Sequence, residues 1–365
     1  MREARKKHAV FSKMKKRGLF RLIAVLAIVL IGGPLILDAC AKKSEPAAEE
    51  NLVEAKKIQI GFSLDSLVIE RWQRDRDVFV SKAQELGAEV NVQNANGDLN
   101  TQIAQIEYFI QKEVDVIVVV TNDSTGLSDT IKKVKDAGIA VIAYDRLIMD
   151  APIDLYISFD NERVGSLMAE SLSDRLGGKG RILMICGPLE DHNVELVMKG
   201  FHQVIDGTGI EIVQVDYAPN WLSETGFSVT SNYLGNGGTI DGIMCGNDSI
   251  AGQAIKALAE RRLAISVPVV GQDADLDACQ RVVEGTQLMT VYKPVEKLAG
   301  QAAEFAVKLA KQEKIDVSET IENGGRRIPY IRLEPTAVTK ENMDEVIIGK
   351  YHQESDVYRN LPTKE

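Results

Sequence analysis

The sequence contains few of the residues that build metal sites and disulfide frameworks. Four histidines and four cysteines occur among 365 residues, with neither a Cys-X-X-Cys nor a His-Glu-X-X-His pattern. Apart from Cys40, the cysteines are Cys186, Cys245 and Cys279, which lie far apart in apolar surroundings. An odd number of widely spaced cysteines is not typical of a disulfide scaffold. The sequence therefore predicts no metal and no cofactor, and it leaves the redox state of Cys186 and Cys245 open.

Beyond its first residues the chain also lacks an excess of basic charge. Residues 1–39 carry nine Lys and Arg and two acids, a net charge of +7, whereas the whole chain has a formal net charge of −10. The rest of the chain therefore has a net charge of −17. Nucleic acids are bound by basic patches that neutralise their phosphates. The negative charge of residues 40–365 argues against a nucleic-acid partner. It suits a domain that an anionic membrane surface repels.

The N-terminal segment has the composition of an export signal. A basic head is followed by the apolar run LIAVLAIVLIGGPLILDAC at 22–40. A basic head, an apolar middle and a short exit are typical of a secretory signal peptide. The closing Leu37-Asp38-Ala39-Cys40 resembles a bacterial lipobox, although Asp38 stands where a small or apolar residue is usual. We expect residues 1–40 to be a signal peptide with lipidation at Cys40, and a plain signal anchor is the alternative.

The remaining chain alternates short β-branched runs with amphipathic stretches. Alternating strands and helices predict a doubly wound parallel sheet. Two such series occur in tandem, so we expect two similar α/β lobes. The strand-like runs are 58–63, 89–95, 115–121 and 139–145 in the first series, and 181–187, 211–217, 241–247 and 267–273 in the second.

The segments after the second series indicate a hinge. A strand-like run at 286–294 and a helical stretch at 296–312 follow it, so we expect the chain to cross between the lobes more than once. Residues 41–55, rich in Ala, Glu and Lys, predict a flexible tether. The predicted domains are residues 56–160 plus 293–320 for the N-terminal lobe and 161–292 plus 321–365 for the C-terminal lobe.

Planar or charged polar side chains follow many of the predicted strands. Ligands of parallel sheets bind outside the carboxyl ends of the strands. Carboxylates, amides and guanidinium groups can each pair with two hydroxyl groups, as a sugar requires. Taken singly, an Asp or Asn after a strand is more often a helix cap, and a lone Arg or Lys is usually solvated. The candidate residues are Arg71, Trp72, Asp145, Arg146, Asn193, Asn247, Asp273 and Lys293.

Two tryptophans are all that the sequence contains, and both have polar neighbours. Trp72 follows the first predicted strand, in ERWQRDRD, and Trp221 lies in the second series, in APNWLSETG. A sugar ring presents apolar C–H faces and a polar edge, so flat aromatic rings cover the former while charged groups bind the latter. We expect Trp72 and Trp221 to cover opposite faces of one sugar. A core tryptophan beneath a helix is the alternative for either ring.

Several motifs in this order resemble the bacterial D-xylose-binding proteins. The motifs are ERWQRDRD, QNANGD, QIAQIE, AYDRLI, YISFDNERVG, GNDS, GQDAD and GTQLMTVYKP, and the resemblance covers roughly residues 57–350. These proteins are substrate-binding subunits of ABC importers in the type I periplasmic binding protein superfamily. His192 departs from the family pattern, which has an Asn there.

The resemblance implies a function as well as a fold. It implies a monomeric, exported, lipid-anchored protein that binds D-xylose by hinge closure and passes it to a membrane permease, without catalysis. The family's sugar contacts fall on Arg71, Trp72, Asp145, Arg146, Asn193, Trp221, Asn247, Asp273 and Lys293.

Four alternatives to this function can be considered. A multi-sugar receptor or a sensory subunit for chemotaxis or a histidine kinase would use the same pocket. A glycosidase could pair Asp145, Asp273 and Glu190, but Arg146 and Lys293 would keep such acids ionised. A repressor would need a DNA-binding headpiece where this chain has its export signal.

Overall fold

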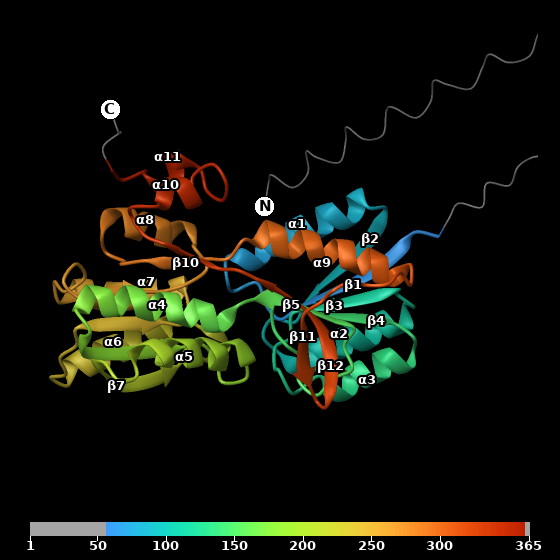
Figure 1. Cartoon of the computed structure of the whole chain (residues 1–365), viewed down its shortest axis with the longest axis horizontal. Helices are drawn as coiled ribbons and strands as arrows, with labels where there is room; N and C mark the ends of the chain where they lie inside the picture. The colour runs from blue at the N-terminus through green and yellow to red at the C-terminus, as the bar shows by residue number, and fades with distance from the viewer. Residues whose placement is uncertain (1–55, 362–365) are drawn as a thin grey trace, which may run out of the picture. The chain divides into compact units, whose positions relative to one another are not determined.

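The computed structural model describes residues 56–361. The signal peptide, Cys40 and tether predicted for residues 1–55 lie outside the described residues. Within residues 56–361 no helix is long and apolar enough to cross a membrane. The chain forms two parallel sheets with helices on both faces (Figure 1), which confirms the two predicted α/β lobes.

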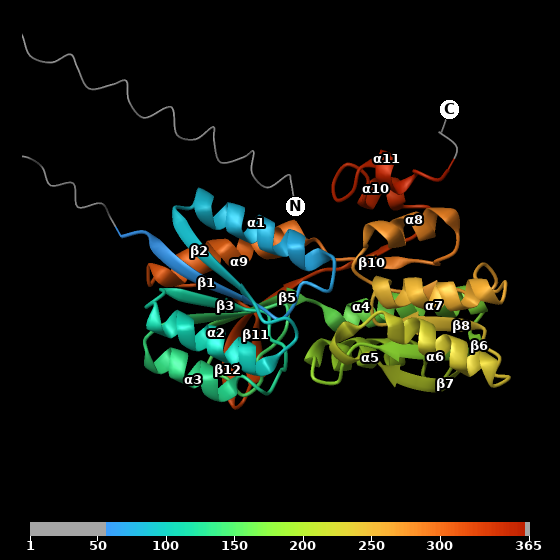
Figure 2. The same cartoon turned by 180° about the vertical axis from the view of Figure 1, so that it is seen from behind.

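The first lobe is built on a seven-stranded sheet with the order β11-β12-β5-β4-β3-β1-β2. Every neighbouring pair is parallel except β11 and β12. Helices α1 and α9 pack together on one face, and α2 and α3 lie on the other (Figures 1 and 2). The strands are β1 (Ile58–Leu64), β2 (Ala88–Asn94), β3 (Val116–Val119), β4 (Ala140–Tyr144), β5 (Leu155–Phe159), β11 (Thr320–Asn323) and β12 (Arg326–Leu333), and the helices are α1 (Arg71–Glu85), α2 (Leu99–Gln111), α3 (Ser128–Asp136) and α9 (Val295–Ala310).

The second lobe repeats this plan with a smaller parallel sheet of order β7-β6-β8-β9. Helices α4 and α5 pack together, as do α6 and α7, and α8 and α11 pack beside the antiparallel pair β10-β13. The strands are β6 (Lys179–Cys186), β7 (Gly209–Tyr217), β8 (Gly242–Cys245), β9 (Val269–Val270), β10 (Thr290–Tyr292) and β13 (Thr336–Val338), and the helices are α4 (Asn161–Leu176), α5 (His192–Ile205), the 3-10 turn η1 (Pro219–Trp221), α6 (Glu224–Gly235), α7 (Asp248–Glu260), α8 (Leu276–Glu284), α10 (Met343–Val346) and α11 (Glu354–Val357).

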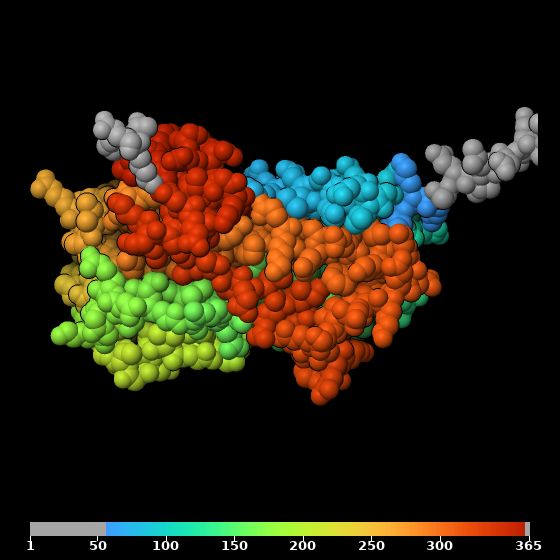
Figure 3. Space-filling view, turned by 45° about the horizontal axis from the view of Figure 1, so that its top comes forward, coloured from blue at the N-terminus to red at the C-terminus, as the bar shows by residue number. Residues whose placement is uncertain are grey.

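The chain crosses between the two sheets three times, after β5, after β10 and after β12. In Figure 3 the C-terminal segment, coloured red, covers part of the surface of both lobes. The prediction that residues 321–365 all belong to the second lobe is wrong for β11 and β12. Strand β12 pairs with β5, and the ring of Tyr330 stacks on that of Tyr156 at 4.7 Å between centroids. This pairing provides hydrogen-bond partners for the backbone of β5. Without β12, strand β5 would be an exposed edge of the sheet.

Helices α4 and α5 approach closely, and this contact positions the start of α5 at the candidate site. A Cβ atom at Gly165 of α4 would lie 1.9 Å from the carbonyl oxygen of Val197, and one at Gly200 of α5 would lie 1.8 Å from that of Glu162. Only glycine permits such an approach. The side chain of Asp191 caps α5 by accepting a hydrogen bond from the N–H of Asn193 at 3.0 Å.

Candidate binding site

A cavity lies where strand ends from both sheets face one another. It holds about 460 Å³ of empty space, a figure that includes open solvent at its mouth. Eight of the nine side chains predicted to contact a ligand line it: Arg71, Trp72, Asp145, Arg146, Asn193, Trp221, Asp273 and Lys293. The first and second lobes both contribute, as expected for a ligand held at the carboxyl ends of two parallel sheets.

Arg71, the first residue of α1, is surrounded by buried carboxylates. Its Nη2 lies 2.6 Å from Asp145 Oδ2, its Nε lies 3.1 Å from Asp75 Oδ2, and its Nη1 lies 3.8 Å from Asp273 Oδ1 of the second lobe. Burial alone would lower the pKa of Arg71, but the charges of Asp145, Asp75 and Asp273 raise it well above its ordinary value. Arg71 therefore stays charged, and its guanidinium lies 4.4 Å from the ring centroid of Trp72.

Asp75 was not predicted, and it lies behind Arg71 without lining the cavity. Its buried carboxylate accepts hydrogen bonds from Arg71 and from the hydroxyl of Tyr144. Burial raises the pKa of Asp75 to about 6, against the opposing charge of Arg71. Arg71 and Asp75 are four residues apart on one helix, a spacing at which ion pairs form. That spacing is the signal that could have identified Asp75 from sequence.

Asp145 follows β4 in a left-handed backbone conformation, with φ of 63°. Burial would raise the pKa of its carboxyl group, but the charges of Arg71, Lys293 and Arg146 outweigh burial and lower the pKa. The side-chain amide of Asn193, in the second lobe, donates to Asp145 Oδ1 at 3.1 Å and to its carbonyl oxygen at 3.2 Å. Asp145 is therefore an ionised acceptor that contacts both lobes.

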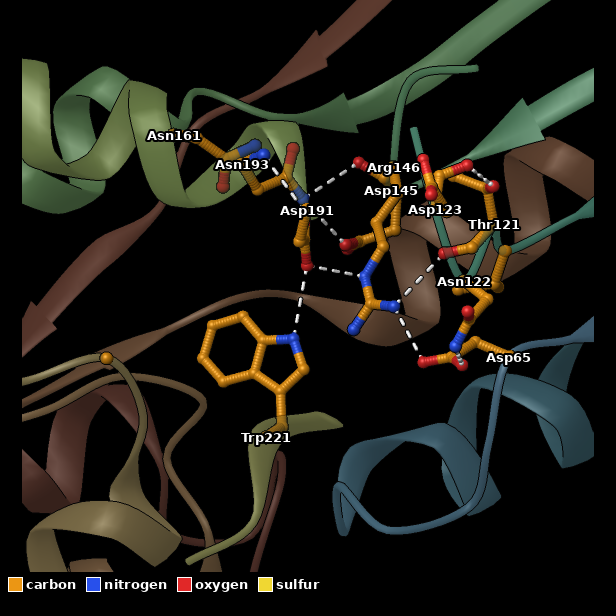
Figure 4. A network of polar contacts seen from close by, with 12 residues as sticks. Asp65, Thr121, Asn122, Asp123, Asp145, Arg146, Asn161, Asp191, Asn193 and Trp221 are labelled. Carbon is orange, nitrogen blue, oxygen red and sulfur yellow. Dashed lines mark hydrogen bonds and ion pairs between the residues drawn. The ribbon is translucent and has the colours of Figure 1, made fainter. Parts of the chain in front are cut away.

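Arg146 joins the lobes through two carboxylates that the sequence analysis did not select. Its Nη1 donates to Asp65 at 2.7 Å in the first lobe, and its Nε lies 2.7 Å from Asp191 Oδ2 in the second. Figure 4 shows Arg146 and Trp221 both reaching Asp191, with the indole Nε1 of Trp221 donating to Oδ2 at 3.2 Å. Asp65 and Asp191 lie in loops, where spacing gives no indication of partners far apart in sequence.

The two tryptophans come from different lobes and line the same cavity, with exposed fractions of 2% for Trp72 and 6% for Trp221. The ring of Trp221 rests against Gly187, where a Cβ atom would lie 2.4 Å from ring carbons. Guanidinium groups cover Trp72, that of Arg71 at 4.4 Å and that of Arg146 at 5.6 Å from the ring centroid.

Asp273 and Lys293 complete the charged part of the lining. Lys293 Nζ lies 3.1 Å from Asp273 Oδ1. Gln272, the neighbour of Asp273 in sequence, also lines the cavity and donates through Nε2 to the carbonyl oxygen of Gly246. Gln272 was not predicted, although its position in the same loop as Asp273 is a usable signal.

Asn247 is the predicted residue that does not line the cavity. Its Oδ1 accepts hydrogen bonds from the N–H of Ile250 at 2.9 Å and from the hydroxyl of Ser249 at 3.0 Å, so its side chain caps α7. A strand end followed directly by a helix favours capping over ligand contact. Its Nδ2 is buried and has no hydrogen-bond partner among residues 56–361.

Four polar atoms of the lining side chains are buried and have no hydrogen-bond partner among residues 56–361: Trp72 Nε1, Asn193 Oδ1, Gln272 Oε1 and Asp273 Oδ1. Asp273 Oδ1 has ionic contacts with Lys293 and Arg71 but no hydrogen bond of good geometry. Buried polar atoms are nearly always paired. A donor and three acceptors around one cavity suit a ligand with several hydroxyl groups, each of which can donate and accept.

Two other kinds of chemistry can be compared with the described residues. No group of three or more His, Cys, Asp or Glu within residues 56–361 could hold a metal ion. A glycosidase needs an acid whose pKa is raised, whereas that of Asp145 is lowered, and Glu190 is exposed and outside the lining.

The thiols of Cys186, Cys245 and Cys279 are free. Ile185 is the register partner of Cys245, so Cys186 points to the opposite face of the sheet and is not placed to form a disulfide with Cys245.

Residues 60–314 match the periplasmic binding protein domain, over most of the chain. The chain belongs to this family. Among curated relatives of this periplasmic binding protein, the D-xylose-binding periplasmic protein of Haemophilus influenzae is 43% identical over 83% of this chain and 93% of its own. The protein of the same name from Escherichia coli is also 43% identical, over the same shares.

Solved structures agree with this assignment. An ABC transporter solute binding protein from Clostridium phytofermentans, with bound β-D-glucose, has a TM-score of 0.76 and 26% identity, and the match covers 82% of this chain and 99% of that one. The predicted type I periplasmic binding protein fold is confirmed, and the relatives are named as binding proteins, in agreement with the prediction that this one is not an enzyme.

Proposed function

We propose that this periplasmic binding protein captures D-xylose between its two lobes and delivers it to the membrane permease of an ABC importer. The main support for the proposal is a group of buried polar atoms that lack a hydrogen-bond partner among residues 56–361, around one cavity that two tryptophans also line. The D-xylose-binding names of relatives 43% identical to this chain favour this pentose as the ligand.

The chemistry of the lining is sufficient for useful affinity. Micromolar binding requires about −8 kcal/mol. Hydrogen bonds to charged groups contribute on the order of 1.5–3 kcal/mol each, and Arg71, Asp145, Asp273 and Lys293 supply such groups. Contacts with an aromatic face add roughly 0.5–1.5 kcal/mol. Several of these interactions together are therefore needed, because association itself costs roughly 4–15 kcal/mol.

Closure of the two lobes is the step that capture requires. The direct contacts of Arg146 with Asp191 and of Asn193 with Asp145 join the lobes around the cavity. A sugar that binds both lobes has a higher affinity for the closed arrangement than for an open one, and this difference shifts the population toward closure. No covalent step is involved.

The proposal includes export and a membrane anchor. A signal peptide at residues 1–40 with lipidation at Cys40 would hold a monomer outside the cytoplasmic membrane, close to its permease. The nine predicted residues, Asn247 among them, remain the proposed ligand contacts. A sensory receptor subunit would use the same cavity; finding a permease and an ATPase encoded beside this protein would favour transport.

Isothermal titration with D-xylose, L-arabinose, D-ribose, D-galactose and D-glucose tests the proposal. We expect D-xylose to bind with a micromolar or lower Kd and the other sugars more weakly. The solved relative with bound β-D-glucose makes a multi-sugar receptor the second candidate, and equal affinities for D-xylose and D-glucose would favour it. Absence of heat with all five sugars would contradict the proposal.

A further inference from the structure

One wall of the cavity is apolar, and all of it comes from the second lobe. Its side chains are those of Cys186, Val194, Val197, Met198 and Met244. The charged side chains of the lining, by contrast, lie around Arg71 and Asp145. The cavity therefore has a polar side and a side without strong hydrogen-bonding groups.

The five side chains come from two groups, each of which shares one face of its element. Met244 is the register partner of Met184 on the neighbouring strand, and Cys186 lies two residues beyond Met184, so Met244 and Cys186 share one face of the sheet. On α5, Val194, Val197 and Met198 are three and four residues apart, the spacing of neighbours on one helix face.

The backbone beside this wall leaves few free polar groups. The carbonyl oxygen of Cys186 accepts a hydrogen bond from the N–H of Ala218 at 2.9 Å, and the N–H of Gly246 donates to Ile185 at 2.7 Å. The carbonyl oxygen of Gly246 accepts from Gln272.

Two polarisable side chains of the wall, Met198 and Cys186, also offer little to a ligand hydroxyl. Tyr217 already donates its hydroxyl to the sulfur of Met198, at 3.8 Å. Burial raises the pKa of the Cys186 thiol to about 12, so this group carries no charge at neutral pH.

We infer that this wall discriminates against hexoses by facing the ring edge that has no hydroxyl group in a pentopyranose. The inference rests on the proposed function. D-Glucose has the ring hydroxyls of D-xylose and an additional hydroxymethyl group on C5. If the shared hydroxyls contact the polar side, the additional hydroxyl lies against Val194, Met198 and Met244, whose side chains offer it no strong hydrogen bond. A hydrophobic pocket rejects an added hydroxyl by up to about 100-fold.

The test compares D-xylose, D-glucose and 6-deoxy-D-glucose by isothermal titration of the full chain. The last sugar has a methyl group in place of the hydroxymethyl, so it separates the size of the C5 substituent from its polarity. We expect Kd to increase from D-xylose to 6-deoxy-D-glucose and then by about tenfold or more to D-glucose. D-Glucose binding as tightly as 6-deoxy-D-glucose would overturn the inference.

A variant that adds a hydroxyl group to the wall gives a second test. Val194→Thr preserves side-chain size and should reduce the ratio of the Kd for D-glucose to that for D-xylose by about fivefold or more. Val204→Thr is the control on the same helix, at a residue outside the lining, and should leave the ratio unchanged. A ratio that Val194→Thr does not alter would contradict the role of the wall.

The two proposals fail in different ways. If D-xylose does not bind, the proposed function fails, and the inference with it. If D-xylose binds but D-glucose binds equally well, sugar binding stands and the role of the wall is refuted. The comparison of the three sugars needs no variant, so it holds even if Val194→Thr does not fold.

Discussion

Asp145 is the residue at which the charges of the cavity meet. Its pKa is lowered although the carboxylate is buried, because Arg71, Lys293 and Arg146 outweigh the cost of burial. The ionised carboxylate of Asp145 also accepts a hydrogen bond from Asn193 of the second lobe. A ligand hydroxyl that donates to Asp145 would form a charge-assisted hydrogen bond, which is stronger than a neutral one.

Replacing this carboxylate tests its role. Asp145→Asn keeps the shape but removes the charge that pairs with Arg71, and we expect the Kd for D-xylose to increase tenfold or more. Isothermal titration measures the change, and Asp136→Asn, on an exposed part of α3, is the control. An unaltered Kd would mean that Asp145 only positions Arg71.

Gly187 determines where the ring of Trp221 can lie. A Cβ atom at residue 187 would come within 2.4 Å of that ring, so Gly187→Ala must displace the indole. We expect at least a tenfold loss of D-xylose affinity with a melting temperature close to that of the wild type. Gly300→Ala, where a Cβ atom has no neighbour within 4 Å, serves as the control. Retained affinity in Gly187→Ala would remove Trp221 from the binding site.

At the scale of elements, the start of α7, strand β10 and the loop before α8 meet over the buried carboxyl group of Asp248. This group accepts hydrogen bonds from Thr290 at 2.6 Å, from Gln287 at 2.7 Å and from the N–H of Asp275 at 3.2 Å. Burial raises its pKa from 3.8 to about 7, with Arg281 opposing the shift. The folded state therefore binds this proton more tightly than the unfolded state does.

This shift predicts a pH dependence of stability. A group whose pKa is raised by folding stabilises the folded state below its unfolded pKa, and that contribution is lost as pH rises through the folded value. We expect the melting temperature to fall between pH 4 and pH 7, with Asp75, whose pKa is about 6, acting in the same direction. Asp248→Asn should make the decline shallower in thermal melts. An identical slope in both proteins would refute this account of Asp248.

The elements also show which parts of the fold the sequence predicts. Strand β3 is buried at every position and lies within the predicted strand-like run 115–121, whose apolar residues suit a parallel strand covered on both faces. The placement of β11 and β12 was wrong because a strand-like pattern does not reveal which sheet edge is free. The pairing of β12 with β5 in the folded chain shows which sheet these strands join.

The site residues also divide into those that a sequence pattern predicts and those that only contacts in the folded chain reveal. Residues directly after strands, such as Asp145 and Lys293, were predicted because the sheet topology brings strand ends together. The loop residues Asp65 and Asp191 were not, since each is identified by its contact with Arg146, which exists only in the folded chain. For Asn247 the sequence could not separate a ligand contact from a helix cap, because both roles occupy the same position after a strand, and in the structure its side chain caps α7.

At the scale of the whole molecule, the central claim is that one sugar contacts both lobes. The sequence contains only two tryptophans, and they line the cavity from different lobes. Trp72→Phe leaves Trp221 as the single indole, and Trp221→Phe leaves Trp72. Each variant therefore reports on one lobe alone.

The most direct measurement is the tryptophan fluorescence of these two variants during titration with D-xylose. The account predicts that both emission spectra change and that, within each variant, the change follows the Kd which calorimetry gives for that same variant. A response from only one variant, with the sugar bound in both, would place the ligand on a single lobe and contradict capture between them.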